Sequence, residues 1–183
     1  MRSHKILKAV AVMAAAPSAA LLIAGSASAA PSPTLSFSSS TDGASAGWSH
    51  GKGSAIDLTL GSNSASTFAM VTFHHFAPAT VGTVGEPQFA TDNYAAGSPR
   101  FYITLDNGDT LWGYPSNAGV GSTGSHLGWA IDNGNTYQSW ADVQSTESSA
   151  NVTGAYVIAD GDQGPGTTDT ITSLSFDGVH FNS

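Results

Sequence analysis

The chain of 183 residues carries 13 acidic and five basic side chains, and it contains no cysteine. Three basic residues lie within the first eight positions, so the chain beyond them has two basic residues, Lys52 and Arg100, against 13 acidic ones, a net charge of −11. This charge excludes non-specific binding to nucleic acid or to an anionic membrane surface, because both need clustered cations. The lack of cysteine excludes a disulfide framework, a thiolate zinc site and a cysteine nucleophile.

Residues 1–29 are predicted to form a cleaved secretory signal peptide. A basic start precedes an apolar stretch at residues 9–24, and small residues in an Ala-x-Ala pattern follow at residues 27–29. A transmembrane anchor is the alternative, but the apolar stretch has about 15 residues where a spanning helix needs roughly 20. We therefore expect a secreted, extracellular protein whose mature form starts near Ala30 and is not inserted in a membrane.

Residues 30–46 are rich in serine, proline and threonine, and we expect them to form a flexible lead-in. The alternative is that residues 35–37 pair as a first strand. The remaining residues, 47–183, have the size of a single domain with room for a hydrophobic core.

Hydrophobic and polar residues alternate along much of this domain, which is typical of half-buried β-strands. A helix of one or two turns is expected at residues 140–144, with Ser139 as its N-cap. The connections are rich in glycine, asparagine and serine, so the sequence predicts an all-β fold, a single β-sandwich of jelly-roll type. The main expected strands are residues 54–60, 68–76, 101–105, 110–114, 155–160, 170–176 and 178–181.

The dipeptide Asn107-Gly108 separates two of these strands, residues 101–105 and 110–114. Asn-Gly is typical of two-residue type I′ hairpin turns, because both central residues of such a turn need a positive φ. We therefore expect a tight hairpin at this point.

Three carboxylates, Asp160, Asp162 and Asp169, lie close together in sequence around a glycine-rich turn between two expected strands. Ca²⁺ binds several oxygen ligands from a flexible loop, so these residues predict a structural calcium site. The full EF-hand spacing is missing, and the alternative is a polar hairpin loop whose aspartates cap turns. No other cofactor is expected.

A second candidate site is a polar loop between two tryptophans. Exposed aromatic rings stack on the apolar faces of sugars, and amide or carboxylate groups bind the sugar hydroxyls. The alternative is that the tryptophans fill the core, which we expect for Trp112 and at least one other. The candidate glycan-binding residues are Trp129, Asp132, Asn133, Asn135, Tyr137 and Trp140.

Arg100 is expected to form a structural ion pair, with Asp92 as the nearest acidic residue in sequence. His74 and His75 are neighbours in an expected strand, so their side chains point to opposite faces and do not chelate one metal as a pair.

No catalytic constellation stands out. Residues 43–47 match the G-x-S-x-G nucleophile motif, but no helix follows them, so we interpret the match as chance. Only two glutamates, Glu86 and Glu147, are present, and neither lies in a pattern that aims two acids into one groove, as glycoside hydrolysis requires.

Residues 91–101, 105–108, 113–115, 159–163 and 169–172 resemble a group of uncharacterised secreted bacterial β-sandwich proteins. That resemblance covers nearly all of the expected mature chain and implies export and a compact β-domain. A weaker likeness, at the level of pattern, is to jelly-roll carbohydrate-binding modules, and it carries over no binding residue.

The sequence as a whole favours a secreted, non-catalytic β-sandwich that binds glycan or cell-envelope material. The first alternative is an extracellular enzyme that acts on polysaccharide, either a hydrolase or a lyase. The second is a structural protein of the cell surface. The expected partner is a polysaccharide or cell-wall glycan, with no nucleic acid and no membrane insertion.

Overall fold

The computed structural model describes residues 33–182 except residues 64–65, 77, 94–98 and 116–125. The predicted signal peptide, residues 1–29, and the expected N-terminus near Ala30 lie outside the described residues. Within the described part of the chain, no helix is long and apolar enough to cross a membrane.

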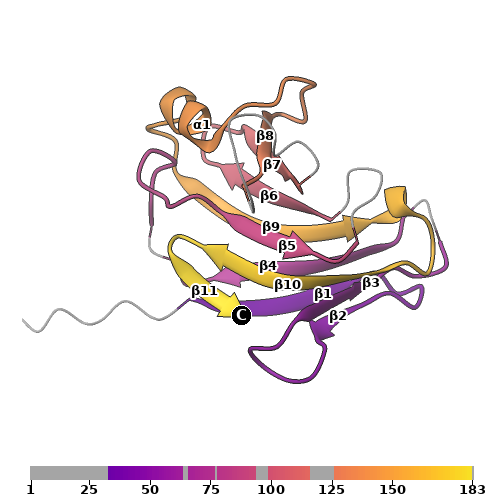
Figure 1. Ribbon diagram of the computed structural model, residues 1–183. Coiled ribbons are helices and arrows are strands. Elements are labelled where there is room, and N and C mark those ends of the chain that lie inside the picture. Colours follow the sequence, from indigo (N-terminus) through magenta and orange to yellow (C-terminus); the bar gives the residue numbers. More distant parts are fainter. Residues whose placement is uncertain (1–32, 64–65, 77, 94–98, 116–125, 183) are drawn as a thin grey trace, which may run out of the picture.

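The described chain folds as two antiparallel β-sheets with one α-helix (Figure 1), which confirms the predicted all-β sandwich. One sheet has six strands, in the spatial order β1 (Thr34–Ser39), β4 (Phe68–His74), β9 (Val152–Asp160), β6 (Arg100–Leu105), β7 (Thr110–Tyr114) and β8 (Gly128–Ile131). The five-stranded sheet has the order β11 (Val179–Asn182), β10 (Thr168–Phe176), β3 (Ile56–Thr59) and β2 (Ser45–Trp48), with β5 (Gln88–Thr91) also paired to β10.

The connection from β9 to β10 joins the two sheets through the 3₁₀ turn η2 (Gly161–Gln163). In the six-stranded sheet β9 lies between β4 and β6, and in the other sheet β10 pairs with both β3 and β5. The consecutive strands β3–β4 and β5–β6 therefore cross between the sheets alongside β9–β10. Such paired crossings between two antiparallel sheets are typical of jelly-roll sandwiches.

The sandwich begins earlier in the chain than expected. Strand β1 pairs with β4 from Thr34 to Ser39, and β2 starts at Ser45, so the expectation of a flexible lead-in over residues 30–46 is wrong from Thr34 onward. The alternative pairing at residues 35–37 is the one that forms. Leu35 and Phe37 pack against the core, while serine and threonine occupy the exposed face. A serine-rich segment can therefore form this edge strand, because only one of its faces has to be apolar.

Burial alternates along the strands, so each strand gives one face to the core. On β6, Phe101, Ile103 and Leu105 are buried, and the residues between them lie half-buried on the outer face of the six-stranded sheet. Each fully buried large apolar side chain stabilises the fold by about 1.5–3 kcal/mol. This alternation decides which side chains remain available for binding.

Helix α1 (Trp140–Thr146) forms where a short helix was expected. The hydroxyl of Ser139 accepts a hydrogen bond from the backbone N–H of Asp142, and the Asp142 carboxylate accepts one from the N–H of Ser139, which completes a capping box. Trp140 and Val143 are buried, and the helix packs beside β8 at one end of the sandwich (Figure 1).

The hairpin at Asn107-Gly108 joins β6 to β7 as predicted, but its turn has a different type. The N–H of Leu105 donates to the carbonyl of Asp109 (3.0 Å) and the N–H of Gly108 donates to the carbonyl of Leu105 (3.3 Å). Only Gly108 has a positive φ, +96°. The loop therefore has three residues, 106–108, and is a type I turn that ends in a left-handed glycine.

Candidate functional site

Three aromatic residues form a row across the outer face of the six-stranded sheet. In the strand register, Tyr102 of β6 lies opposite Trp112 of β7 on one side and opposite Tyr156 of β9 on the other. We call these three residues the aromatic row. All three are half-buried, and the residues on either side of Tyr102 in β6 are fully buried, so the row stands on the face that is turned away from the core.

The rings of the aromatic row contact one another. The centroids of Tyr102 and Trp112 are 4.4 Å apart with an interplanar angle of 40°, and those of Tyr102 and Tyr156 are 5.8 Å apart at 30°. Pairs in this geometry stabilise one another by about 0.5–1.5 kcal/mol beyond the burial of their area. The row is therefore a fixed surface rather than three independent side chains.

A glycine makes room for one end of the row. A Cβ atom at Gly154 would be 2.5 Å from the Tyr156 hydroxyl oxygen and 2.9 Å from its Cε2 atom, and 2.8 Å from the hydroxyl oxygen of Thr104. The Tyr156 ring thus lies over the backbone of Gly154, which is two residues earlier on the same face of β9. The hydroxyl end of the Tyr156 side chain therefore occupies the space that a side chain at position 154 would take.

Beyond Tyr156 the row continues in small hydroxyl side chains. Thr72 of β4 lies opposite Tyr156, and Ser36 of β1 lies opposite Thr72. At the other end, Thr110 accepts a hydrogen bond at its hydroxyl from the Trp112 indole N–H (3.0 Å), which fixes the orientation of that ring. The row therefore combines stacking surfaces with hydroxyl groups that hydrogen-bond.

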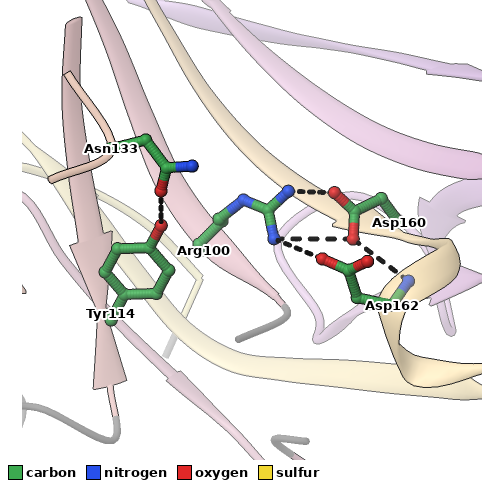
Figure 2. Close-up of polar contacts among 5 residues, drawn as sticks. All are labelled: Arg100, Tyr114, Asn133, Asp160 and Asp162. Atoms are coloured by element: carbon green, nitrogen blue, oxygen red, sulfur yellow. Dashed lines mark hydrogen bonds and ion pairs between the residues drawn. The ribbon is translucent and has the colours of Figure 1, made fainter. Parts of the chain in front are cut away.

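Arg100 lies beside the row and is held by two carboxylates (Figure 2). Its guanidinium carbon is 5.0 Å from the centroid of the Trp112 ring, within the range of a cation–π contact. It forms an ion pair with Asp160, the last residue of β9, and its Nη1 lies 3.7 Å from a carboxylate oxygen of Asp162. The Arg100 side chain is 11% exposed and that of Asp162 is 65% exposed, so the Asp162 carboxylate faces solvent while the guanidinium of Arg100 is largely covered.

The predicted ion pair between Arg100 and Asp92 is wrong. The Asp92 carboxylate instead accepts a hydrogen bond from the backbone N–H of Thr170 (2.8 Å). Asp160 is the partner because β9 lies directly beside β6, with Ile158 opposite Arg100, so residues 60 positions apart meet on one face. Closeness in sequence was a poor guide, since a sheet brings distant strands together.

The loop after β8 is tied to the same face. Asp132 and Asn133 have φ values of 52° and 54°, and the N–H of Gly134 donates to the carbonyl of Ile131 (3.0 Å), which defines a type I′ turn. The Asp132 carboxylate accepts from the N–H of Thr110 (2.9 Å). The Tyr114 hydroxyl donates to the side-chain oxygen of Asn133 (2.7 Å; Figure 2).

The predicted glycan-binding residues divide into two groups. Trp129 is 0% exposed and Trp140 is 5% exposed, and their rings pack together in the core at 4.8 Å, so their prediction as sugar-stacking residues is wrong. Asp132, Asn133 and Asn135 are exposed in the loop after β8. The half-buried Tyr137 ring contacts Tyr114 edge-on at 5.5 Å, so the loop lies next to the aromatic row.

Trp112 was expected in the core and lies instead on the outer face. Its neighbours Leu111 and Gly113 point inward, and a Cβ at Gly113 would be 2.9 Å from the Trp129 ring. The core therefore contains Trp129 where Trp112 was expected. Sequence reasoning missed the aromatic row, although Tyr102 and Tyr156 stood at alternating positions in two expected strands.

The three residues of the predicted calcium site separate in space into two environments. Asp160 and Asp162 contact Arg100, whereas Asp169 is fully buried and accepts a hydrogen bond from the Gln163 side chain (3.0 Å). Burial raises the pKa of Asp169 to about 6, and the nearby Asp92 carboxylate adds to the increase. No three metal-ligating side chains gather among the residues that the structure describes, and the calcium site stays a prediction.

Two further sequence predictions concern the neighbouring histidines His74 and His75 and the G-x-S-x-G match at residues 43–47. His74 and His75 are both exposed, and His75 has a φ of 60°, so the strand ends between them. Ser45 of the G-x-S-x-G match begins β2 and does not lie in a strand-to-helix turn.

Sequence reasoning also missed the pair formed by His126 and Glu86. The Nδ1 atom of His126 and a carboxylate oxygen of Glu86 are 2.6 Å apart.

Comparisons with protein-family models, with curated proteins and with solved structures find no match to this chain.

Proposed function

We propose that this protein is a secreted, non-catalytic β-sandwich that binds glycan chains of a polysaccharide or cell envelope through the aromatic row. The observation that carries the proposal is the contact of Trp112, Tyr102 and Tyr156 across three neighbouring strands on an outer sheet face. These rings lie outside the core, and a contiguous aromatic patch on a sheet face favours a role in binding.

Sugar rings suit this surface because one face of a pyranose is apolar and its edge carries hydroxyls. The Tyr156 and Trp112 rings provide the apolar contacts. Thr72, Thr104 and the exposed Asp162 carboxylate flank the row and provide hydrogen-bonding groups for hydroxyls. Neighbouring strands are about 4.8 Å apart, so the row extends for about 10 Å across the strands. This length suits a short stretch of a glycan chain rather than a single sugar.

The charge of this face favours a neutral glycan. Arg100 is the basic residue beside the row, and its guanidinium is already engaged by Asp160 and Asp162. The protein as a whole is strongly acidic. A polysaccharide rich in uronic acids or phosphate would therefore meet like charge, which disfavours its binding.

The test is a depletion assay of the purified protein against insoluble neutral polysaccharides, including cellulose, chitin and xylan. We expect at least one to retain the protein, and Tyr156→Ala to reduce retention about tenfold or more, since stacking of one ring contributes on the order of 1–2 kcal/mol. Trp48→Ala, a half-buried tryptophan on β2 in the other sheet, is the matched control and should bind as the wild type does. Retention by none of the polymers, or equal loss in both variants, would contradict the proposal.

A polysaccharide-active enzyme is the second candidate, and the His126–Glu86 pair is the observation that favours it. A carboxylate hydrogen-bonded to one imidazole nitrogen orients the ring for acid–base chemistry. A release assay for reducing ends or unsaturated products would detect this activity. If product is formed and His126→Gln abolishes its formation, the protein is an enzyme; binding without product supports the non-catalytic proposal.

A further inference from the structure

A pocket of about 460 Å³ opens between the two sheets at the edge formed by β1, β2 and β11. Five apolar residues line it, together with a threonine, a lysine and a histidine. This volume lies within the usual range for sites that bind small molecules. The lining residues with a role in the binding proposed below are Leu35, Trp48, Val179, Phe181 and Lys52.

The apolar wall is built from core-facing residues at the open edge of the sandwich. Trp48 contacts Phe37 edge-on at 5.6 Å, and Phe181 contacts Phe73 edge-on at 5.2 Å. Both rings are thus supported from the core side. Leu35 lies on the inward face of β1, opposite in direction to Ser36 and the outer face that carries the aromatic row.

Lys52 is held by a hydrogen-bonded loop between β2 and β3. The Ser54 hydroxyl donates to the carbonyl of Gly51 (2.7 Å) and accepts from the N–H of His50 (3.1 Å). Gly51 and Gly53, on either side of Lys52, have φ values of 114° and 89°, which lets the chain turn sharply there. The loop therefore brings a cation to the pocket.

The charge of Lys52 has no acidic partner in the part of the chain that the structure describes. Arg100, the other arginine or lysine in that part, is paired with Asp160 and Asp162. An acidic protein of this kind has carboxylates in excess, so an ammonium group left without one beside an apolar pocket is a complementary site for an anion.

We propose that this pocket binds a small monocarboxylic acid with an apolar body, such as a medium-chain fatty acid or an arylalkanoic acid. The apolar body packs against Leu35, Trp48 and Phe181, and the carboxylate accepts a charge-assisted hydrogen bond from the Lys52 ammonium group. This site is separate from the aromatic row and does not depend on glycan binding.

The test is a titration of the purified protein with octanoate and with 3-phenylpropionate, followed by calorimetry and by tryptophan fluorescence. We expect saturable binding with a change in the emission of Trp48. Octan-1-ol, which lacks the charge, and inorganic phosphate, which lacks the apolar body, should each bind about tenfold more weakly or not at all, because a charge-assisted hydrogen bond contributes about 1.5–3 kcal/mol.

Variants locate the site. Lys52→Met should weaken binding of the acids about tenfold or more and leave octan-1-ol unaffected, whereas Lys52→Arg should retain acid binding. Lys52 is exposed in a loop, so these variants keep the fold. Trp112→Ala, in the aromatic row, should leave acid binding unchanged. Absence of saturable binding of either acid, equal affinity in Lys52→Met, or loss of acid binding in Trp112→Ala would each overturn the proposal.

Discussion

Gly154 and Tyr156 lie on the same face of β9, and the tyrosine side chain occupies the space that a side chain at position 154 would need. The hydroxyl oxygen of Tyr156 would be 2.5 Å from a Cβ at Gly154. The position of the Tyr156 ring, and with it one end of the aromatic row, therefore depends on a glycine two residues away.

Replacing Gly154 with alanine should displace the Tyr156 ring. We expect the variant to lose about 1–3 kcal/mol of unfolding free energy, since a methyl group must be forced into filled space, and to bind glycan more weakly. Gly47→Ala is the matched control, because Gly47 is also in a strand and no atom lies within 4 Å of the position that its methyl group would take. Urea unfolding and polysaccharide retention measure both effects; a Gly154→Ala protein that behaves like Gly47→Ala would show that the ring does not need the glycine.

Gly108 closes the β6–β7 hairpin in the left-handed region, with a φ of +96°. Gly108→Val should cost on the order of 1 kcal/mol or more, because a β-branched residue resists a positive φ. Gly108→Asn should cost less, since asparagine tolerates this conformation. The midpoint of thermal unfolding reports the order of the three proteins, and equal midpoints for valine and asparagine would place the strain elsewhere.

The type of this turn decides which sheet face Trp112 occupies. A two-residue turn at Asn107-Gly108 would pair Trp112 with Ile103, which is a core residue. The observed three-residue loop shifts the register by one position, so Trp112 pairs with Tyr102 on the outer face. A shift of one residue moves every side chain of a strand to the other face.

Local patterns predicted the fold class and many of its strands, but not β2, β5 or β8. Alternation in β6, β9 and β10 and the Ser139–Asp142 capping box identified strands and helix that the structure confirms. The binding face was harder to predict, because it depends on which strands become neighbours. Arg100 meets Asp160 only because β9 lies beside β6.

Asp169 should make stability depend on pH. Its pKa in the folded protein is about 6, above its usual value of 3.8, so the folded state binds the proton more tightly than the unfolded chain does. The stabilisation from this group is complete below about pH 4 and is lost as the pH rises through 6. The total loss is on the order of 3 kcal/mol at most.

The comparison with Asp169→Asn isolates this effect, because Asp42 and Asp106 have lowered pKa values and act in the opposite direction. The difference in unfolding free energy between the variant and the wild type should grow in favour of the variant from pH 4 to pH 6. A constant difference over that range would mean that Asp169 is already ionised in the folded protein.

Calcium tests the remaining loop prediction. If Asp160, Asp162 and Asp169 share a Ca²⁺ ion, the melting temperature should rise with calcium beyond the rise at equal ionic strength of Na⁺, and less with Mg²⁺. Asp162→Ala should abolish this rise. No rise beyond the Na⁺ control would contradict the calcium site at these residues, and a rise that persists in Asp162→Ala would locate the ion elsewhere.

The affinity of the Trp112→Ala variant for a neutral polysaccharide that retains the wild-type protein is the most direct test of glycan binding by the aromatic row. Trp112 contacts both Tyr102 and Arg100, so its replacement by alanine removes a stacking ring from the aromatic row. The core residues Leu111 and Trp129 remain in place. We predict a dissociation constant about tenfold or more above that of the wild type, with an unchanged fold by circular dichroism. Wild-type affinity in a folded Trp112→Ala protein would contradict the assignment of the aromatic row as the glycan-binding site.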